Sequence, residues 1–509
     1  MRCGSLLVLV ALAGCPGGNG AIGDHCSDRG DCSSSLQCVA STCVARCGRA
    51  PDCGDGYSCD AEGLCHLATG QLGAACTSEV DCAAGLSCEI DGTATDAMGH
   101  LAASCVTQNA GKPAGDTCVT DGDCRNGTCA LGHCVDLCAD TRDCGEGTSC
   151  ALIPRVEASG TMFTGCLQSH GALRWSLPVH GPADTVALPI PAPYGIGSTD
   201  IARSVAVTFS VADSNQLVGA TQVIAPDGTI AVSGVIENGE LVNYYTDPVR
   251  HKPDFGQSVL AMPSTPDHPL QRGGEYTLHV ESQTTGPMGP SPGTATPSAV
   301  VVLKLDASVI LDLHFYFLNF DEHPCPDALG LDAATASTKS FFQNDYLLAL
   351  RSIFANAGIA LGTVTYEDLR DHPDLDGLDV ANAPSLLALG SHDVGVNVFF
   401  VRTLSPVGLQ AYAAAPGPAG LANTPGSGIV IGLDTLCYRS WNALARTTAH
   451  EIARYMGLYD NEEIGGAVDP IHDDDTAMPS ANLMFYSELG GTDLSPDQRD
   501  ILSRSAVLR

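Results

Sequence analysis

The sequence predicts a multidomain protein in which small disulfide-rich repeats come first, a β-sandwich follows, and an α/β (α+β) domain ends the chain. Three patterns support this prediction. Of the 24 cysteines, all but four lie between Cys26 and Cys166. Alternating apolar residues without a helical period occupy 167–306, and strand patterns separated by helical patterns occupy 307–509. A chain of 509 residues is also too long to fold around one core.

The amino terminus, "MRCGSLLVLVALAGC", predicts a secretory signal peptide over 1–15, because one Arg precedes an apolar stretch that ends in small residues. Its last four residues, "LAGC", resemble a bacterial lipobox. The resemblance implies cleavage before Cys15, lipidation of Cys15 and a flexible tether over 16–25. The alternative is an ordinary signal peptide with a chance cysteine. We therefore expect an exported, outward-facing cell-envelope lipoprotein whose only membrane contact is the lipid.

The charge of the chain excludes one class of partner. There are 58 Asp and Glu residues against 24 Lys and Arg, a formal net charge of −34. Such a surface repels phosphate backbones, so we expect no nucleic-acid binding. Extracellular proteins or peptides are the expected partners.

The cysteine-rich region, 26–166, divides into five units of four cysteines, each opening with Cys-x5-Cys. The units begin at Cys26, Cys47, Cys76, Cys118 and Cys138. An even number of cysteines in an exported chain indicates disulfides rather than zinc sites. Each unit has too few apolar residues for a core, so cross-links worth ~2–4 kcal/mol each must hold it. Four cysteines allow three pairings, and the spacing does not choose among them. The array is either a stalk or a ligand-binding region.

The middle region, 167–306, is predicted to be a β-sandwich accessory domain. "VAVTFSV" and "GGEYTLHV" alternate apolar and polar residues, and "APDGT" carries an Asp-Gly turn. "AVVVLKL" supplies a last strand, while the Pro-rich and Gly-rich segment 284–298 is predicted to be a loop. This domain either docks a substrate or serves as a spacer.

The carboxy-terminal region, 307–509, alternates strands and helices. "ILDLHFYFL" and the segments 394–401 and 428–433 predict strands, and "SFFQNDYLLALRSIFANAG" predicts a helix that stops at Gly358. A second helix is expected from about 440 to 456, ending before Gly457. Its buried stripe is predicted to contain Trp441, Leu444, Thr448, Ile452 and Met456.

That second helix carries the most informative motif. "HEIARYMGLYD" places His450, Glu451, Gly457 and Asp460 at the spacing His-Glu-x-x-x-x-x-Gly-x-x-Asp. In this respect the region resembles the metzincin zinc metallopeptidases. The resemblance implies a metzincin-like domain in which His450 and Asp460 ligate zinc. It also implies that Glu451 is the catalytic general base that polarises zinc-bound water.

A second motif follows in the order that the same family shows. "ANLMFYSELGG" contains Asn-Leu-Met-x-Tyr, which is similar to the Met-turn of the pappalysin-like branch. The resemblance implies that Met484 lies beneath the metal and that Tyr486 lies near it. "LSPDQRDIL" looks like the short helix that follows.

One residue departs from the family pattern. Residues four apart on a helix share a face, so a second zinc-binding histidine is required four residues after His450. Arg454 stands there instead. A guanidinium has no lone pair to donate, and its charge opposes a dication by roughly 8 kcal/mol at 4 Å and an effective dielectric of 20. Arg454 is expected to bridge Glu451 and Asp460 in place of the metal.

Three functional hypotheses follow. The first is a zinc-impaired pseudoprotease that binds proteins or peptides and has no cofactor. The second is an active zinc endopeptidase with a substitute ligand. The candidates for that ligand are His314, His472 and Tyr486. The third is a binding or adhesion protein that acts through its cysteine-rich repeats.

Two further features of the carboxy-terminal region have structural interpretations. The acidic clusters 371–379 and 472–475 are either calcium sites or solvated loops, and neither fits an EF-hand. Cys325 and Cys437, the one pair of cysteines that follows the repeats, are expected to form a disulfide.

Overall fold

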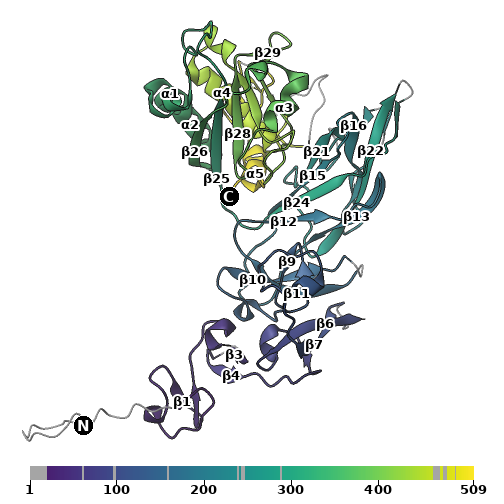
Figure 1. The fold of residues 1–509 in the computed structure, drawn as a ribbon, viewed down its shortest axis with the longest axis vertical. Helices are drawn as coiled ribbons and strands as arrows, with labels where there is room; N and C mark the ends of the chain where they lie inside the picture. Colours follow the sequence, from purple (N-terminus) through teal and green to yellow (C-terminus); the bar gives the residue numbers. More distant parts are fainter. Residues whose placement is uncertain are drawn as a thin grey trace, which may run out of the picture.

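The structure is a computed structural model of the whole chain (Figure 1). It describes residues 20–54, 56–59, 62–95, 99–156, 160–234, 236–237, 240–241, 247–286, 289–461, 470–473, 479–487 and 489–509. The expected signal peptide and Cys15 lie outside these residues. In Figure 1 the cysteine-rich repeats form one end of the chain, and the sheet-rich regions form the other.

The five cysteine-rich units are confirmed, and all have the same pairing. In every unit the first cysteine bonds the third and the second bonds the fourth. The disulfides are Cys26–Cys38, Cys32–Cys43, Cys47–Cys59, Cys53–Cys65, Cys76–Cys88, Cys82–Cys105, Cys118–Cys129, Cys124–Cys134, Cys138–Cys150 and Cys144–Cys166. Disulfides of this number are typical of exported proteins.

Each unit has an aspartate directly before its second cysteine, and this aspartate fixes the local backbone. It is the last residue of a short 3-10 helix, or in the second unit the last but one, and its carboxylate accepts backbone N–H groups at the start of that helix. Asp31, for example, accepts from Ser27 at 2.6 Å and from Asp28 at 3.2 Å. The helices are η1 (Arg29–Asp31), η2 (Ala50–Cys53), η3 (Glu79–Asp81), η4 (Asp121–Asp123) and η5 (Thr141–Asp143). The repeated "DC" in the sequence therefore has a structural cause.

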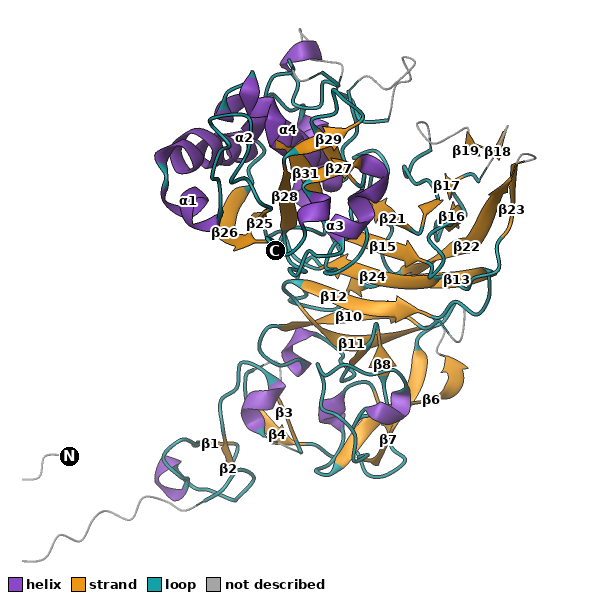
Figure 2. Cartoon of the chain, turned by 45° about the horizontal axis from the view of Figure 1, so that its top comes forward, coloured by secondary structure: helices purple, strands orange, loops and turns teal. Residues whose placement is uncertain are grey.

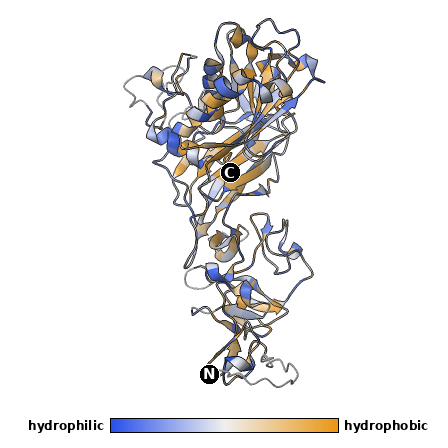
Figure 3. Ribbon diagram, turned by 90° about the vertical axis from the view of Figure 1, so that its left-hand side faces the viewer, coloured by the Kyte–Doolittle hydropathy of each residue, from blue (hydrophilic) through white to orange (hydrophobic). Residues whose placement is uncertain are grey.

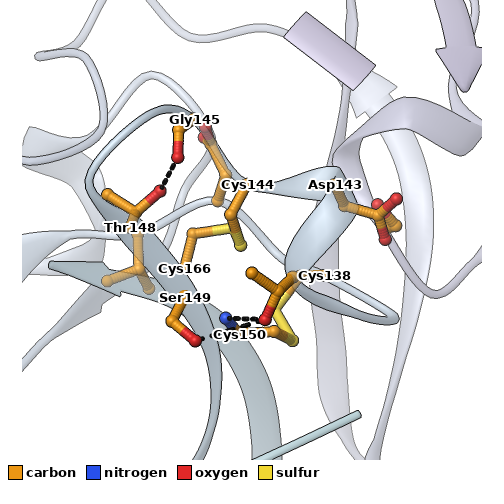
Figure 4. Close-up of a disulfide and its surroundings, with 12 residues drawn as sticks. Cys138, Asp143, Cys144, Gly145, Thr148, Ser149, Cys150 and Cys166 are labelled. Atoms are coloured by element: carbon orange, nitrogen blue, oxygen red, sulfur yellow. Dashed lines mark hydrogen bonds between the residues drawn. A yellow bond between two sulfur atoms is a disulfide. The ribbon is translucent and has the colours of Figure 1, made fainter. Parts of the chain in front are cut away.

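Short antiparallel pairs of strands complete the units. These are β1 (Gln37–Val39) with β2 (Thr42–Val44), β3 (Tyr57–Cys59) with β4 (Cys65–Leu67), β5 (Ala75–Cys76) and β6 (Leu86–Thr95) with β7 (Leu101–Thr107), β8 (Cys129–Ala130) with β9 (His133–Cys134), and β10 (Thr148–Pro154) with β11 (Met162–Gln168). Cysteines make up most of three small buried clusters in these units, and apolar residues of the last three units join the core of the sheets that follow. Figure 4 shows the last unit, where the two disulfides gather and Thr148 donates a hydrogen bond to the Gly145 carbonyl at 2.7 Å.

The expected flexible tether needs a correction at its carboxy-terminal end. Gly20 donates to the Asp31 carbonyl at 3.1 Å, and Gly23 donates to the Cys43 carbonyl at 2.8 Å. Residues 20–25 therefore belong to the first unit, because their main-chain groups are paired with it. Residues 16–19 lie outside the described residues.

A sheet-rich region follows the repeats, as predicted. A four-stranded sheet has the order β12-β24-β15-β21, and a second sheet has the order β13-β22-β16-β17 with β20 and β23 at its margins. Their bounds are β12 (Ala172–Leu177), β13 (Ala183–Ile190), β15 (Ser204–Ser210), β16 (Gln216–Ile224), β17 (Ile230–Val232), β20 (Asp254–Phe255), β21 (Gln257–Met262), β22 (Gly274–Gly286), β23 (Gly289–Pro292) and β24 (Ser298–Lys304). Two small elements lie nearby, β14 (Ala192–Pro193), which pairs with β10, and the pair β18 (Ile236–Glu237) and β19 (Glu240–Leu241).

The prediction of a loop across 284–298 is wrong in part. β22 extends to Gly286 and pairs with β23, with Gln283 opposite Pro292 and Thr285 opposite Pro290. Prolines are tolerated here because β23 is an edge strand, where a missing N–H breaks few ladder bonds.

The carboxy-terminal region contains a mixed sheet and most of the helices (Figure 2). The sheet order is β26-β25-β28-β31-β30, parallel except for the last pair. The strands are β25 (Ile310–Phe317), β26 (Ala360–Asp368), β28 (Val396–Val401), β30 (Ala411–Ala413) and β31 (Ile429–Gly432), with β27 (Gly377–Asp379) and β29 (Thr403–Ser405) as a separate pair. The helical elements are α1 (Ala333–Thr338), the π-helical η6 (Phe341–Leu347), α2 (Leu348–Asn356), η7 (Pro373–Leu375), η8 (Val380–Asn382), α3 (Ala383–Leu387), η9 (Leu433–Cys437), α4 (Trp441–Tyr455), η10 (Pro479–Ala481) and α5 (Pro496–Arg504). No described helix has the length and apolarity needed to cross a membrane.

The two sheet-rich regions pack directly on each other. β15 is buried on both faces, because Val207 and Phe209 lie in the apolar core of region 167–306 while Ala206 lies in that of the carboxy-terminal region. Lys304 donates to the Leu508 carbonyl at 2.7 Å across this junction. Figure 3 shows apolar strands gathered in this part of the chain. The junction therefore holds the two regions in a fixed relation.

The predicted disulfide between Cys325 and Cys437 is confirmed. It joins the segment after β25 to the end of η9, a few residues before α4 begins. The start of α4 is therefore tied covalently to the sheet.

Candidate functional site

Helix α4 positions the motif residues. Ser440 caps it, with its hydroxyl accepting from the Ala443 N–H at 3.3 Å, and Gly457 follows its end with φ of +111°. The whole predicted stripe is buried. The helix is buried on almost every side, since Ala445, Ala449 and Ala453 are covered as well. Small residues there allow close packing, so His450 and Glu451 are carried on a rigid element.

His450 is held on both sides of its ring. Its Nδ1 lies 2.9 Å from the Leu483 carbonyl, and its Nε2 lies 3.4 Å from Asp460 Oδ1. A carbonyl can only accept, so Nδ1 carries the proton of this hydrogen bond. The Nε2 atom then faces a carboxylate. That contact is attractive only if Nε2 is also protonated or if a cation lies between the two.

The Asp460 carboxylate is stabilised in its charged form. Burial raises the pKa of Asp460, but the contact with His450 and the charges of Arg454 and Arg250 outweigh burial, so the pKa lies below its usual value. Asp460 therefore remains anionic.

Arg454 lies one turn beyond His450 and pairs with Glu451. Its Nη1 is 3.9 Å from Glu451 Oε2, an ion pair longer than a hydrogen bond. The expected bridge from Arg454 to both acids is found for Glu451. For Asp460 the close side-chain contact is His450, and Arg454 acts on it through its charge.

The donor set does not fit a tightly held zinc ion. The 3.4 Å between His450 Nε2 and Asp460 Oδ1 matches the separation of about 3.3 Å between two ligands of tetrahedral zinc. However, structural and catalytic zinc sites use at least three protein ligands. Among the described residues, three or more ligand atoms of His, Cys, Asp and Glu come together only in the disulfide clusters. Arg454 stands where the second histidine ligand is required, and a guanidinium cannot bind zinc.

Arg446 holds the loop beneath the site and was missed by the sequence reasoning. It lies one turn before His450, is 7% exposed, and donates to four main-chain carbonyls. The acceptors are Leu483 at 2.7 Å, Phe485 at 3.0 Å, Ser487 at 3.0 Å and Gly491 at 3.2 Å. Burial lowers the pKa of Arg446 to about 10, and the charges of Asp460 and Glu451 oppose that shift. The position of Arg446 beside the apolar stripe of α4 was the one signal in the sequence that could have indicated this role.

The loop after α4 brings the second motif to the first. Met484 is fully buried, and its carbonyl accepts from Asn461 at 3.0 Å. Asn482 shapes the turn by accepting from the Met484 N–H at 2.7 Å and donating to Gln498 at 3.0 Å. The segment that follows Asp460 and the methionine turn are therefore bonded directly to each other.

A pocket of about 430 Å³ opens over these residues. Its lining combines α4, the loop before β30 and the methionine turn: Gly408, Leu409, Gln410, Ala411, Tyr438, Arg446, Thr447, His450, Glu451, Arg454, Asp460 and Tyr486. Tyr486 is 65% exposed, so it lies at the rim.

The other candidate ligands have different surroundings. His472 contacts Asp497 at 2.9 Å, and His314 contacts Thr365 at 2.8 Å and the Val394 carbonyl at 2.9 Å. Neither lines the pocket. Of the three substitute ligands considered, Tyr486 alone does so.

Three described acids of the acidic clusters have protein partners. Asp376 pairs with Arg402 at 2.6 Å, and Asp379 accepts from the Ala381 N–H at 2.9 Å. Asp473 accepts from Gln498 at 2.9 Å, whereas residues 474 and 475 lie outside the described residues. Asp376, Asp379 and Asp473 therefore act in pairing and capping.

The sheet-rich region 167–306 also contacts the site. Arg250 is 1% exposed, and its guanidinium carbon lies 3.0 Å from the ring centroid of Tyr459, the neighbour of Asp460. The Tyr459 hydroxyl donates to the Arg250 carbonyl at 3.3 Å. The segment that carries Asp460 is therefore fixed by the preceding region.

No protein-family model matches this chain, and no curated protein matches it.

Proposed function

We propose that residues 307–509 form a metzincin-type scaffold that has lost catalytic zinc and binds extended peptide segments of other proteins without cutting them. One observation carries the proposal. A buried imidazole and carboxylate stand at ligand distance from each other, while the position of the next ligand is taken by the cation Arg454. The cluster balances Glu451 and Asp460 with protein cations instead of a metal.

The edge of the sheet supports peptide binding. β30 is an outer strand, and in the described part of the chain it pairs with β31 alone. Gly432 donates to the Gln410 carbonyl at 2.8 Å, so by alternation the main-chain groups of Ala411 and Ala413 face away from β31. An extended peptide can pair with that edge.

The rim of the pocket supports a protein partner as well. Tyr438 and Tyr486, which line the pocket, are large aromatic side chains that are more than half exposed. Large apolar groups gathered around a concave polar site are typical of protein-binding surfaces.

The rest of the chain presents this site in our proposal. Lipidation at Cys15 would anchor the chain to a membrane of the cell envelope, and the disulfide-bonded units would act as the stalk. Detergent phase partitioning tests the anchor: we expect the parent in the detergent phase and Cys15→Ser in the aqueous phase. If the parent and Cys15→Ser partition equally, the proposed lipid anchor is contradicted.

Peptide selection tests the proposed function. Random dodecapeptides displayed on phage are selected on the purified full chain, and the enriched peptides are synthesised. We expect binding that Ala411→Pro weakens, because proline removes an outward N–H without breaking the ladder to β31. We also expect the peptides to stay intact by mass spectrometry.

Cleavage of those peptides, abolished by a chelator, would favour the second candidate, an active zinc endopeptidase. The observation in its favour is the position of Tyr486 at the rim. Tyr486→Phe would then abolish cleavage.

A further inference from the structure

A second groove, of about 310 Å³, lies where the β-sandwich meets the carboxy-terminal region. The sandwich contributes Lys252, Asp254, Phe255 and Gln257 to one wall. Arg454 lines both this groove and the pocket over His450. The two hollows are therefore neighbours that share a side chain.

Strand β30 runs past both hollows. Ala411 lines the first pocket, and Ala413 lines the second groove. The main-chain groups of both residues face away from β31, because Gln410 and Tyr412 are the residues whose main-chain groups face it. A peptide paired with this edge thus continues from one hollow into the other, because consecutive outward groups of a strand bind consecutive residues of its partner.

The wall opposite the sandwich is apolar and stiff. It is built from Tyr412 and four prolines, namely Pro384, Pro416, Pro418 and Pro425. Phe255, on the sandwich side, is 52% exposed. An aromatic ring left half open beside a proline wall suits an apolar side chain of a bound peptide.

Tyr412 connects the second groove to the first site electrostatically. Burial raises the pKa of the Tyr412 phenol, Asp254 and Glu451 raise it further, and Arg454 lowers it. Asp254 belongs to the sandwich, whereas the other two belong to α4. The phenol is therefore close enough to feel charges from both sides.

The junction keeps the two walls in place. The contact of Arg250 with Tyr459, the bond from Lys304 to Leu508 and a bond from Thr265 to the Pro470 carbonyl at 3.1 Å all cross it. Val259, which lines the groove, is also part of the carboxy-terminal core. A preformed groove reduces the entropy lost on binding.

We infer that the β-sandwich is a specificity-determining part of the binding site, whose groove takes the continuation of the same extended peptide and holds one of its apolar side chains against Phe255. This inference rests on the proposed function. It assigns the sandwich a direct contact with the partner rather than the role of a spacer.

The test uses the dodecapeptides selected on the full chain, labelled with fluorescein. Dissociation constants are measured by fluorescence anisotropy for the parent, Phe255→Ser, Ala411→Pro and the control Ile230→Ser. Ile230 is 50% exposed on the same sandwich and does not line the groove. Circular dichroism checks that each variant is folded.

We expect Phe255→Ser to weaken binding about fivefold to tenfold, the loss of one half-exposed aromatic contact, and Ile230→Ser to leave binding unchanged. Peptides truncated at the end that occupies the groove should bind the parent and Phe255→Ser equally. If Ala411→Pro weakens binding while Phe255→Ser does not, the proposed function stands and this inference is overturned. If neither variant matters, or no peptide is enriched, both are contradicted.

Discussion

Residues 26–166 and residues 307–509 are held together in different ways. The first region has ten disulfides, and several of its buried clusters are made largely of cysteine. Apolar residues of its last three units also join the core of the sheets that follow. The second has one disulfide and a continuous apolar core that spans the sheet and α4. Cross-links restrain each small unit locally, whereas packing lets distant segments meet. This difference explains why the candidate site lies in the second region, since that site combines residues that are far apart in the chain.

Reduction should separate the two regions most strongly. Treatment with a phosphine reductant removes cross-links worth ~2–4 kcal/mol each, and in the first two units, residues 26–65, the described residues form no large apolar core that could replace them. We expect residues 26–65 to become sensitive to protease while 307–509 stays protected. Limited proteolysis with mass spectrometry measures this. Protected units after full reduction would show that the comparison is mistaken.

A core substitution should have the converse effect. Phe400 is fully buried and its ring stacks with those of Phe315 and Phe317 at 5.8 and 5.2 Å. Phe400→Ala should lower the free energy of unfolding of the carboxy-terminal region by ~3–5 kcal/mol and leave the disulfide units unchanged. Urea unfolding followed by tryptophan fluorescence measures the loss. Val407→Ala, at a fully exposed position, is the control and should change little.

Loss of Arg446 should loosen the loop that carries the methionine turn. Arg446→Met leaves four carbonyls without their donor, at a cost of ~1–3 kcal/mol. We expect faster amide hydrogen exchange across 479–493 and little change in the units. Arg351→Met, on the exposed side of α2, is the matched control. Equal exchange in both variants would remove Arg446 from the account of the site.

A pH effect should distinguish the cysteine-rich region. Burial raises the pKa of Glu79 to about 8, and the charge of Asp136 raises it further. The folded-state pKa exceeds the unfolded value of about 4.3, so the protonated carboxyl favours folding. Stability should therefore fall as pH rises from about 4 to 8, by at most about 1.4 kcal/mol per pH unit.

The matched variant for that effect is Glu79→Gln, which keeps the shape of the side chain and cannot ionise. Thermal unfolding of the full chain between pH 4 and pH 8, followed at residues 70–166 by hydrogen exchange, should show a flatter profile in the variant. Identical profiles would mean that Glu79 is not the titrating group.

The comparison also explains what the sequence could predict. The cysteine units were visible because their spacing is local and repeated, and the pairing of Cys325 with Cys437 followed because no other cysteines follow the repeats. The stripe of α4 was visible from its period. The pairing inside each unit, the extension of β22 to Gly286 and the burial of both faces of β15 depend on contacts that no local pattern contains.

The same limit applied to the candidate site. The spacing identified His450, Glu451 and Asp460, and it showed that Arg454 interrupts them. It did not show that Arg446 holds the neighbouring loop or that Arg250 packs on Tyr459, because these contacts span 37 to 45 residues and 209 residues of sequence. Long-range contacts of charged groups are set by the fold.

The most direct measurement of the central claim is zinc binding by the full chain, after treatment with a chelator, compared with that of Arg454→His and Arg454→Gln. The account predicts that the parent holds no stoichiometric zinc and that Arg454→His binds one ion per chain at least about tenfold to a hundredfold more tightly. Arg454→Gln removes the charge without adding a donor, so it should gain less. Tightly held zinc in the parent, lost on His450→Ala, would contradict the account.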